Sequence, residues 1–258
     1  MIELLNNAYS TCSQKVRLCL HEKGLPFTDT QIDFRKNEHL APDYLALNPN
    51  GVVPTLVHDG QPIVDSSVIM EYLDEVFPQV PLSPDGPVGR ADMRAWLRYF
   101  EEVPTAAIRV PSFSQIFVRH FAGLTDEQFG AEAKARPLRT HFYQKMGRTG
   151  FSDQEVEASF NALAQTIARM QKRLAGDVWL CGDALTLADI CVYPTFDRMA
   201  DLGPRRCGRR RPTSVAGSPP CARGQPTRQP IIREAASRTV IPNCRKSRYE
   251  AGYLQSPW

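Results

Sequence analysis

Residues 9–13 (YSTCS) place one thiol and several hydroxyls between an apolar run, residues 2–6, and a helical pattern over residues 11–23. The segment therefore lies at a helix N-terminus, where unpaired backbone N–H groups and the positive end of the helix dipole point outward. Such a position stabilises an anion, whether phosphate, carboxylate or thiolate. Helix N-capping by the hydroxyls is the structural alternative.

Two further segments carry groups that could bind a ligand. In residues 50–56 (NGVVPTL), Val53-Pro54 precedes a predicted strand. A cis peptide bond at this proline would leave the Val53 backbone free to pair with an extended, peptide-like ligand. Asp65 and Ser66 open the next predicted helix, where Asp65 can bind an amine and Ser66 a carboxylate. An ordinary N-cap is again the alternative for this pair.

The elements that position these segments alternate between strands and helices. Short apolar runs bounded by turn residues predict strands, and apolar residues at helical spacing predict helices. The predicted strands are residues 2–6, 27–33, 53–58 and 61–64, and the predicted helices are residues 11–23, 39–46 and 66–77. The order of the first domain, residues 1–78, is therefore βαβαββα.

The second half of the chain has a different pattern. Residues 79–88 are rich in proline, which is typical of a linker. Residues 89–203 follow as an all-α domain, with predicted helices over 89–103 and 152–175. Between these helices, residues 104–151 are less regular and gather aromatic side chains, which we expect to form core or to line a substrate pocket. Their histidines lack the spacing of metal ligands, so we assign no metal site.

Composition excludes several classes of protein. Hydrophobic residues make up 42% of the chain and charged residues 23%, values of an ordinary globular protein. Charged residues interrupt every apolar run before it reaches the roughly 18 residues of a membrane helix. The first ten residues lack the pattern of a signal peptide, so we expect a cytoplasmic protein without disulfide bonds.

The last part of the chain differs from the rest. Residues 204–258 contain 12 Lys and Arg but only 2 acidic residues, and they contain 8 of the 21 prolines. They lack a periodic apolar face, so we expect them to be disordered. We interpret them as the product of a reading-frame shift near Gly203, with a native basic extension as the alternative. Because no aromatic residues are interleaved with the arginines, we do not expect nucleic-acid binding.

The three polar segments, in this order and followed by a proline-rich linker and a helical domain, resemble the soluble glutathione transferases. Residues 182–190 (GDALTLADI) are similar to a helix-capping segment of the same family, and Thr186 to Asp189 has the S/T-x-x-D/E pattern of a capping box. The resemblance covers residues 1–203. It implies a thioredoxin-like glutathione-binding domain, a helical domain that covers a site for a small hydrophobic electrophile, glutathione as co-substrate, and a homodimer.

The resemblance also implies roles for particular residues. Ser10 would donate a hydrogen bond to the glutathione sulfur. The backbone of Val53, preceding Pro54, would pair with the cysteinyl unit. Asp65 would bind the γ-glutamyl ammonium and Ser66 its carboxylate. His39 would reach the glycyl carboxylate, although a lone His on a surface helix is the plainer interpretation.

Cys12 bears on the class within the family. The Ser-x-Cys-Ser pattern of residues 10–13 is similar to the zeta class, which includes maleylacetoacetate isomerases, and to tetrachlorohydroquinone dehalogenases. The long segment 104–151 is also similar to the dehalogenase and bacterial β-etherase branches. Cys12 is thus either a catalytic thiol or a small buried side chain. Transfer of glutathione to an electrophile is the expected activity; isomerase, dehalogenase or β-etherase chemistry and a non-catalytic interaction module are the alternatives.

Overall fold

The computed structural model describes residues 1–202, and the basic tail that we predicted to be disordered and frameshifted lies outside the described residues. The N-terminal half follows the predicted order closely. It contains β1 Ile2–Asn6, α1 Thr11–Glu22, β2 Thr28–Gln31, α2 Pro42–Leu47, β3 Thr55–His58, β4 Gln61–Val64 and α3 Ser66–Val76. Two short 3₁₀ helices, Phe34–Lys36 and Glu38–Leu40, precede α2.

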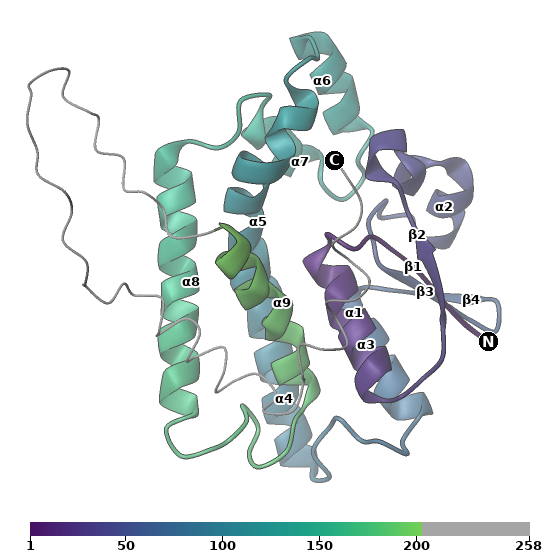
Figure 1. Ribbon diagram of the computed structural model, residues 1–258, viewed down its shortest axis with the longest axis vertical. Coiled ribbons are helices and arrows are strands. Elements are labelled where there is room, and N and C mark those ends of the chain that lie inside the picture. Colours follow the sequence, from purple (N-terminus) through teal and green to yellow (C-terminus); the bar gives the residue numbers. More distant parts are fainter. Residues whose placement is uncertain (203–258) are drawn as a thin grey trace, which may run out of the picture.

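The four strands form one mixed sheet in the order β2-β1-β3-β4. Strand β1 runs parallel to β2 and antiparallel to β3, and β3 and β4 form an antiparallel hairpin. This arrangement confirms the thioredoxin-like fold predicted for the first domain. Helices α1 and α3 lie between the sheet and the helices of the C-terminal half (Figure 1).

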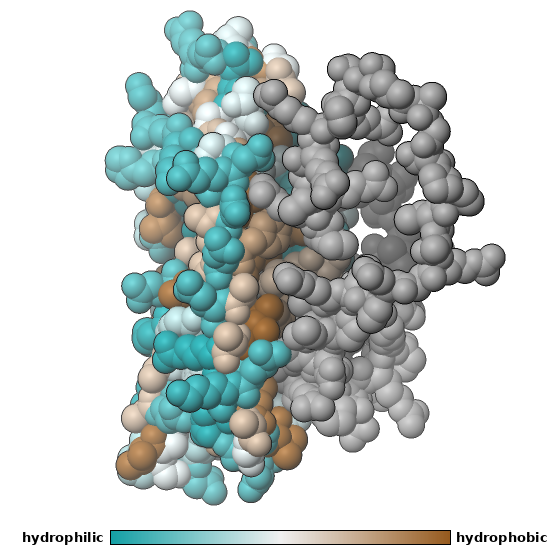
Figure 2. Space-filling view, turned by 90° about the vertical axis from the view of Figure 1, so that its left-hand side faces the viewer, coloured by the Kyte–Doolittle hydropathy of each residue, from teal (hydrophilic) through white to brown (hydrophobic). Residues whose placement is uncertain are grey.

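The C-terminal half is helical, as the sequence predicted. It contains α4 Pro87–Glu102, α5 Pro104–Ser112, α6 Asp126–Lys134, α7 Thr140–Met146, α8 Asp153–Arg173 and α9 Leu187–Leu202. Helix α4 begins two residues earlier than predicted because Pro87 occupies its first turn, where the missing N–H of proline is no loss. On the side of the molecule that carries α8, hydrophilic residues are interspersed with hydrophobic ones (Figure 2).

One hydrophobic core joins the two halves. Leu4 of β1 and Val16 and Leu20 of α1 are fully buried in the same cluster as Leu97 of α4 and Leu163 of α8. The two predicted domains therefore share their main core, and burial of apolar surface at their contact stabilises both.

The segment that we expected to be irregular, residues 104–151, is mostly helical. A π-helical turn, Phe113–Phe117, and a 3₁₀ helix, Val118–Phe121, connect α5 to the rest of the segment. Its aromatic residues form a second core around buried Phe129, Tyr143 and Met146. The ring of Phe113 packs edge-on against the rings of Phe142 and Tyr143. We expected these aromatic residues either to form core or to line a substrate pocket. For the buried ones, the structure supports a role in the core.

Of the capping box predicted at Thr186, the start of α9 shows the half in which the acid three residues later accepts from the Thr186 N–H. The Asp189 carboxylate accepts hydrogen bonds from the backbone N–H and hydroxyl of Thr186 and from the backbone N–H of Leu180. Asp189 is only 2% exposed, and burial raises the pKa of its carboxyl. The acid thus connects α9 to the loop before it, a structural role as predicted.

No helix within residues 1–202 is long and apolar enough to cross a membrane.

Candidate active site

The register of the sheet brings the three predicted segments to one edge. Leu5 of β1 pairs with Thr55 of β3, and Thr55 pairs with Val64 of β4. Residues that follow Leu5, precede Thr55 and follow Val64 therefore lie at the same end of the sheet. These are the Ser10 turn, the Val53-Pro54 pair and the Asp65-Ser66 pair, so the fold brings to one end of the sheet three segments that span 55 residues of sequence, from Ser10 to Asp65.

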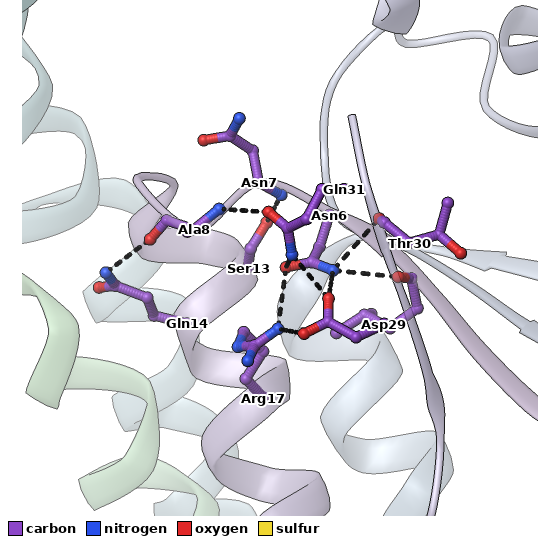
Figure 3. A network of polar contacts seen from close by, with 10 residues as sticks. Asn6, Asn7, Ala8, Ser13, Gln14, Arg17, Asp29, Thr30 and Gln31 are labelled. Atoms are coloured by element: carbon purple, nitrogen blue, oxygen red, sulfur yellow. Dashed lines mark hydrogen bonds and ion pairs between the residues drawn. The ribbon is translucent and has the colours of Figure 1, made fainter. Parts of the chain in front are cut away.

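A polar network holds the turn between β1 and α1 (Figure 3). The Asn6 amide donates to Asp29 on β2 at 2.7 Å, and the Ala8 N–H donates to the Gln31 side chain at 3.1 Å. From α1, the Gln14 side chain donates to the Ala8 carbonyl at 3.0 Å. Because these contacts come from β1, β2 and α1 together, the position of the turn does not depend on a bound ligand.

Ser10 is the N-cap of α1. Its hydroxyl oxygen accepts a hydrogen bond from the Ser13 N–H at 3.2 Å, so the capping interpretation is confirmed. A hydroxyl that accepts one hydrogen bond retains its own hydrogen for donation. The cap and a thiolate-binding role are therefore compatible, and the cap fixes the direction from which the hydroxyl can donate.

Cys12 follows in the first turn of α1 and is half-buried, which differs from the fully buried thiol of the structural alternative. Beneath it lies Lys15, a fully buried ammonium on the same helix. The Lys15 ammonium donates to Glu101 of α4 at 2.6 Å and to Thr105 of α5 at 3.0 Å. Lys15 therefore connects α1, which begins at the Ser10 turn and carries Cys12, to both α4 and α5.

The charge on Lys15 is maintained by its surroundings. Burial by itself would lower the pKa of the ammonium, but its interactions with Cys191, Cys12 and Glu101 outweigh burial and raise that pKa. Burial also raises the pKa of the Cys191 thiol to about 12, so that thiol is neutral at physiological pH. The Glu101 carboxylate is thus the charge that keeps Lys15 protonated.

The Val53-Pro54 peptide bond is cis, as the sequence suggested. Tyr44 and Asn48 of the preceding segment donate to the Val52 carbonyl at 2.7 and 2.9 Å, which orients the chain before the proline. No backbone hydrogen bond joins Val53 to another residue of the described part. Its N–H and carbonyl therefore remain available to an extended ligand.

Asp65 is the N-cap of α3, and its backbone has a positive φ of 74°. One carboxylate oxygen, Oδ1, accepts from the Ser67 N–H at 2.9 Å, from the Ser67 hydroxyl at 2.7 Å and from the Val68 N–H at 3.2 Å. The second oxygen, Oδ2, makes no hydrogen bond to another residue of the part described. Capping therefore uses only half of the carboxylate, and Oδ2 can accept from an ammonium.

His39 occupies a different place from the one predicted. The plainer interpretation put it on a surface helix, but it lies on the second 3₁₀ helix and is only 7% exposed. Its ring packs edge-on against Phe34, and its Nδ1 has no hydrogen-bond partner among the described residues. Burial, followed by the charge of Arg136, lowers the pKa of His39 to about 4. His39 is therefore neutral at physiological pH.

The buried His39 predicts a pH dependence of stability. Its folded pKa of about 4 is below its ordinary value of 6.5, so its neutral form stabilises the fold above pH 6.5 and this stability is lost as the pH falls from 6.5 towards 4. We expect the loss to be about 2–3 kcal/mol, from the size of the shift. Urea unfolding at several pH values measures it. His39→Gln should remove this part of the pH dependence, and substitution of the exposed His141 by Gln should leave it; equal profiles for the two variants would contradict the assignment.

Two arginines near the turn were missed by the sequence interpretation. Arg198 of α9 donates to the Tyr9 carbonyl at 2.7 Å and is 6% exposed. Arg109 of α5 is close enough to Cys12 for their charges to interact. Neither residue stands in a recognisable motif, because both reach the turn from helices that are remote in sequence.

The described residues contain no cluster of three side chains suited to a metal ion.

The arrangement can bind an extended peptide at the Val53 backbone and stabilise a thiolate at the start of α1. Comparison with known proteins agrees with this chemistry. Residues 9–76 match the family of glutathione S-transferase N-terminal domains, and residues 153–223 match that of the C-terminal domains. The second match continues past Gly203, where the sequence interpretation ended the resemblance.

Individual relatives cover most of the chain. It is 31% identical to the protein LigF of a Sphingobium species over 70% of this chain and 72% of that protein. It is 30% identical to glutathione S-transferase 1 of Dianthus caryophyllus, over 75% of each chain. The crystal structure of the β-etherase LigF superposes with a TM-score of 0.69 and 28% identity, over 76% of this chain and 82% of that one.

Proposed function

The chain belongs to the glutathione S-transferase family, and we propose that it activates the thiolate of glutathione for attack on a small hydrophobic electrophile. The proposal rests on three groups at one end of the sheet: the Ser10 hydroxyl that caps α1, the Val53 backbone before the cis-proline, and the Asp65 carboxylate at the start of α3. Within the described residues, the Val53 backbone forms no backbone hydrogen bond and only one oxygen of Asp65 is used by the cap. These three groups match the polar parts of a tripeptide thiol.

In this mechanism each segment has one task. The Val53 backbone pairs with the cysteinyl unit of glutathione, Asp65 Oδ2 accepts from the γ-glutamyl ammonium, and Ser66 with the start of α3 binds the γ-glutamyl carboxylate. Ser10 donates its hydroxyl hydrogen to the sulfur and stabilises the thiolate together with the helix dipole. His39, being buried and neutral, would act on the glycyl end through a hydrogen bond and not through charge.

The experiment that tests the proposal has two stages. Retention on glutathione-agarose with elution by free glutathione tests binding. Conjugation assays with aryl halides, maleylacetone, halogenated hydroquinones and β-aryl ethers then test turnover. A protein that binds glutathione but converts none of these would instead support the interaction-module alternative, and a protein that is not retained would contradict both.

We further propose that the protein acts in the cytoplasm as a homodimer. Val68 and Val76 of α3 are both more than 40% exposed, which supports an additional apolar contact on this helix. Light scattering of the purified protein measures the mass directly.

A reaction that uses Cys12 is the second candidate, favoured by the half-buried position of this thiol beside Lys15 and by the likeness to the β-etherase LigF. In dehalogenase chemistry Cys12 would exchange with a glutathionylated intermediate. For simple transfer we expect Cys12→Ser to keep the conjugation rate within about threefold of the wild type, because Ser10 and not Cys12 acts on the thiolate. Cys181→Ser, at another half-buried thiol, is the matched control. A glutathionylated product that accumulates only with Cys12→Ser, seen by mass spectrometry, would overturn this expectation and establish the thiol reaction.

A further inference from the structure

Arg109 of α5 is a half-buried cation that forms no ion pair within the described residues 1–202. Its guanidinium lies over the Phe142 ring, 5.7 Å from the centroid. It forms no hydrogen bond or ion pair with any other residue in the part that the structure describes. A guanidinium carries five N–H donors, and partly buried donors are normally satisfied.

A second guanidinium makes this arrangement more unusual. Burial and then the positive charge of Arg139, at the start of α7, lower the pKa of Arg109 to about 10. Arg139 is also half-buried and forms no ion pair within residues 1–202. Two cations that repel one another are thus held together, and neither forms an ion pair within residues 1–202.

The nearby carboxylate is already engaged. Glu101 interacts with the charge of Arg109, but its Oε1 accepts the hydrogen bond of Lys15 and contacts the Cys191 sulfur. Lys15 and Arg109 therefore share the charge of a single carboxylate. The stacking of Arg109 on Phe142 explains its direction but not the excess of positive charge, because cation–π contact is worth only about 0.5–2 kcal/mol.

The location of this positive charge indicates which ligand it binds. Arg109 lies one helical turn after Thr105 on α5, and Thr105 accepts from Lys15, which lies one turn after Cys12 on α1. The helical domain therefore brings Arg109 towards Cys12, at the thiol end of the proposed glutathione site, and the two side chains interact electrostatically. The carboxylates of glutathione are assigned above to the start of α3 and to the region of His39. A carboxylate or phenolate bound by Arg109 would therefore come from the second substrate and not from glutathione.

We propose that Arg109, assisted by Arg139, binds an anionic oxygen of the electrophilic substrate, a carboxylate or a phenolate. This inference rests on the proposed function and names its substrate class: an electrophile with an apolar body and one anionic group. A guanidinium binds a carboxylate with two parallel hydrogen bonds, which would orient the reactive carbon towards the thiolate.

A matched pair of electrophiles tests the proposal by turnover. 4-Chloro-3,5-dinitrobenzoate and its methyl ester react with glutathione at the same carbon and differ in one negative charge. We expect Arg109→Met to lower kcat/KM for the carboxylate by about 10- to 100-fold, the effect of losing a charge-assisted hydrogen bond, and to change the ester by less than about threefold. Arg139→Met should act in the same direction. Arg169→Met is the control, since this exposed arginine also stacks on a ring, 4.1 Å from the Tyr99 centroid, and should affect neither substrate.

Two outcomes would overturn the proposal. Equal loss for the carboxylate and the ester would mean that Arg109 acts on the glutathione thiolate or on the fold. Weaker binding of S-methylglutathione by Arg109→Met, measured by calorimetry, would mean that Arg109 binds the tripeptide instead.

A binding measurement separates this proposal from the proposed function. Calorimetry with unreactive 3,5-dinitrobenzoate and with 2,4-dinitrophenolate, each with S-methylglutathione present, tests anion binding without turnover and distinguishes a carboxylate from a phenolate. We expect the wild type to bind at least one of them, and Arg109→Met to bind it about tenfold or more weakly. If the wild type conjugates no electrophile but binds the anion through Arg109, only the proposed function fails; if it conjugates the ester but binds neither anion, only the anion site fails. Arg109→Met should also melt at the same temperature as the wild type or higher, because it removes a repulsion between cations.

Discussion

Replacement of Ser10 by Ala is expected to lower the turnover number for glutathione conjugation by about 10- to 1,000-fold while the affinity for glutathione remains nearly unchanged. The hydroxyl already accepts from the Ser13 N–H, so its hydrogen is the group that can act on the sulfur, and the sulfur is the atom at which charge develops. Steady-state kinetics with a saturating electrophile, together with calorimetric titration of glutathione, measures both quantities.

Because Ser10 also caps α1, a loss of activity must be separated from a loss of stability. Ser10→Ala removes a cap worth about 1 kcal/mol, whereas glycine is nearly as good as serine at an N-cap and lacks the hydroxyl. Ser10→Gly should therefore unfold almost like the wild type and be as inactive as Ser10→Ala.

Asp65→Asn retains an acceptor for the cap of α3 but removes the charge, so it should weaken glutathione binding and spare turnover at saturation. Equal loss of affinity and turnover in both the Ser10 and Asp65 variants would contradict this division of tasks.

Replacement of Lys15 by Met should cause the largest loss of stability, about 2–4 kcal/mol, because it leaves the partly buried Glu101 carboxylate without its cation and Thr105 without its donor. For a chain of this size, that corresponds to a decrease of roughly 5–15 °C in the melting temperature. Calorimetric or spectroscopic unfolding measures it. Lys36→Met, which removes an exposed lysine from a 4.0 Å surface pair, is the control and should change stability by less than about 0.5 kcal/mol.

A double variant tests the physical reason. In Lys15→Met with Glu101→Leu, both charges are replaced by apolar side chains, and much of the lost stability should return, since a buried ion pair is often no more stable than a well-packed apolar pair. If the double variant is as unstable as the sum of the single variants, the effect of Lys15 arises from packing and not from its charge.

Local sequence patterns were sufficient to predict the strands and helices of the first domain and the locations of the candidate segments, but not the helices of residues 104–151. Strand β1 was predicted with its observed ends, because an apolar run next to asparagines is a local signal. The cap at Ser10, the cis bond before Pro54 and the cap at Asp65 were also predictable, since each depends on a side chain and the backbone within three residues of it. Thr186 to Asp189 belongs to the same class of local signal.

The distribution of charges around these segments depends on contacts between remote parts of the chain, which sequence patterns do not report. Lys15 has the sequence context of a surface residue on an amphipathic helix, yet it is buried because α4 and α5 bring Glu101 and Thr105 to it from 86 and 90 residues away. His39 is buried for a similar reason, since Arg136 from beyond α6 packs close to it. Arg109 and Arg139 become neighbours only when α5 and α7 fold around the aromatic core. Periodicity and capping motifs report contacts within one turn of the chain, whereas burial and charge balance depend on which remote surfaces meet, and that is a property of the packed fold.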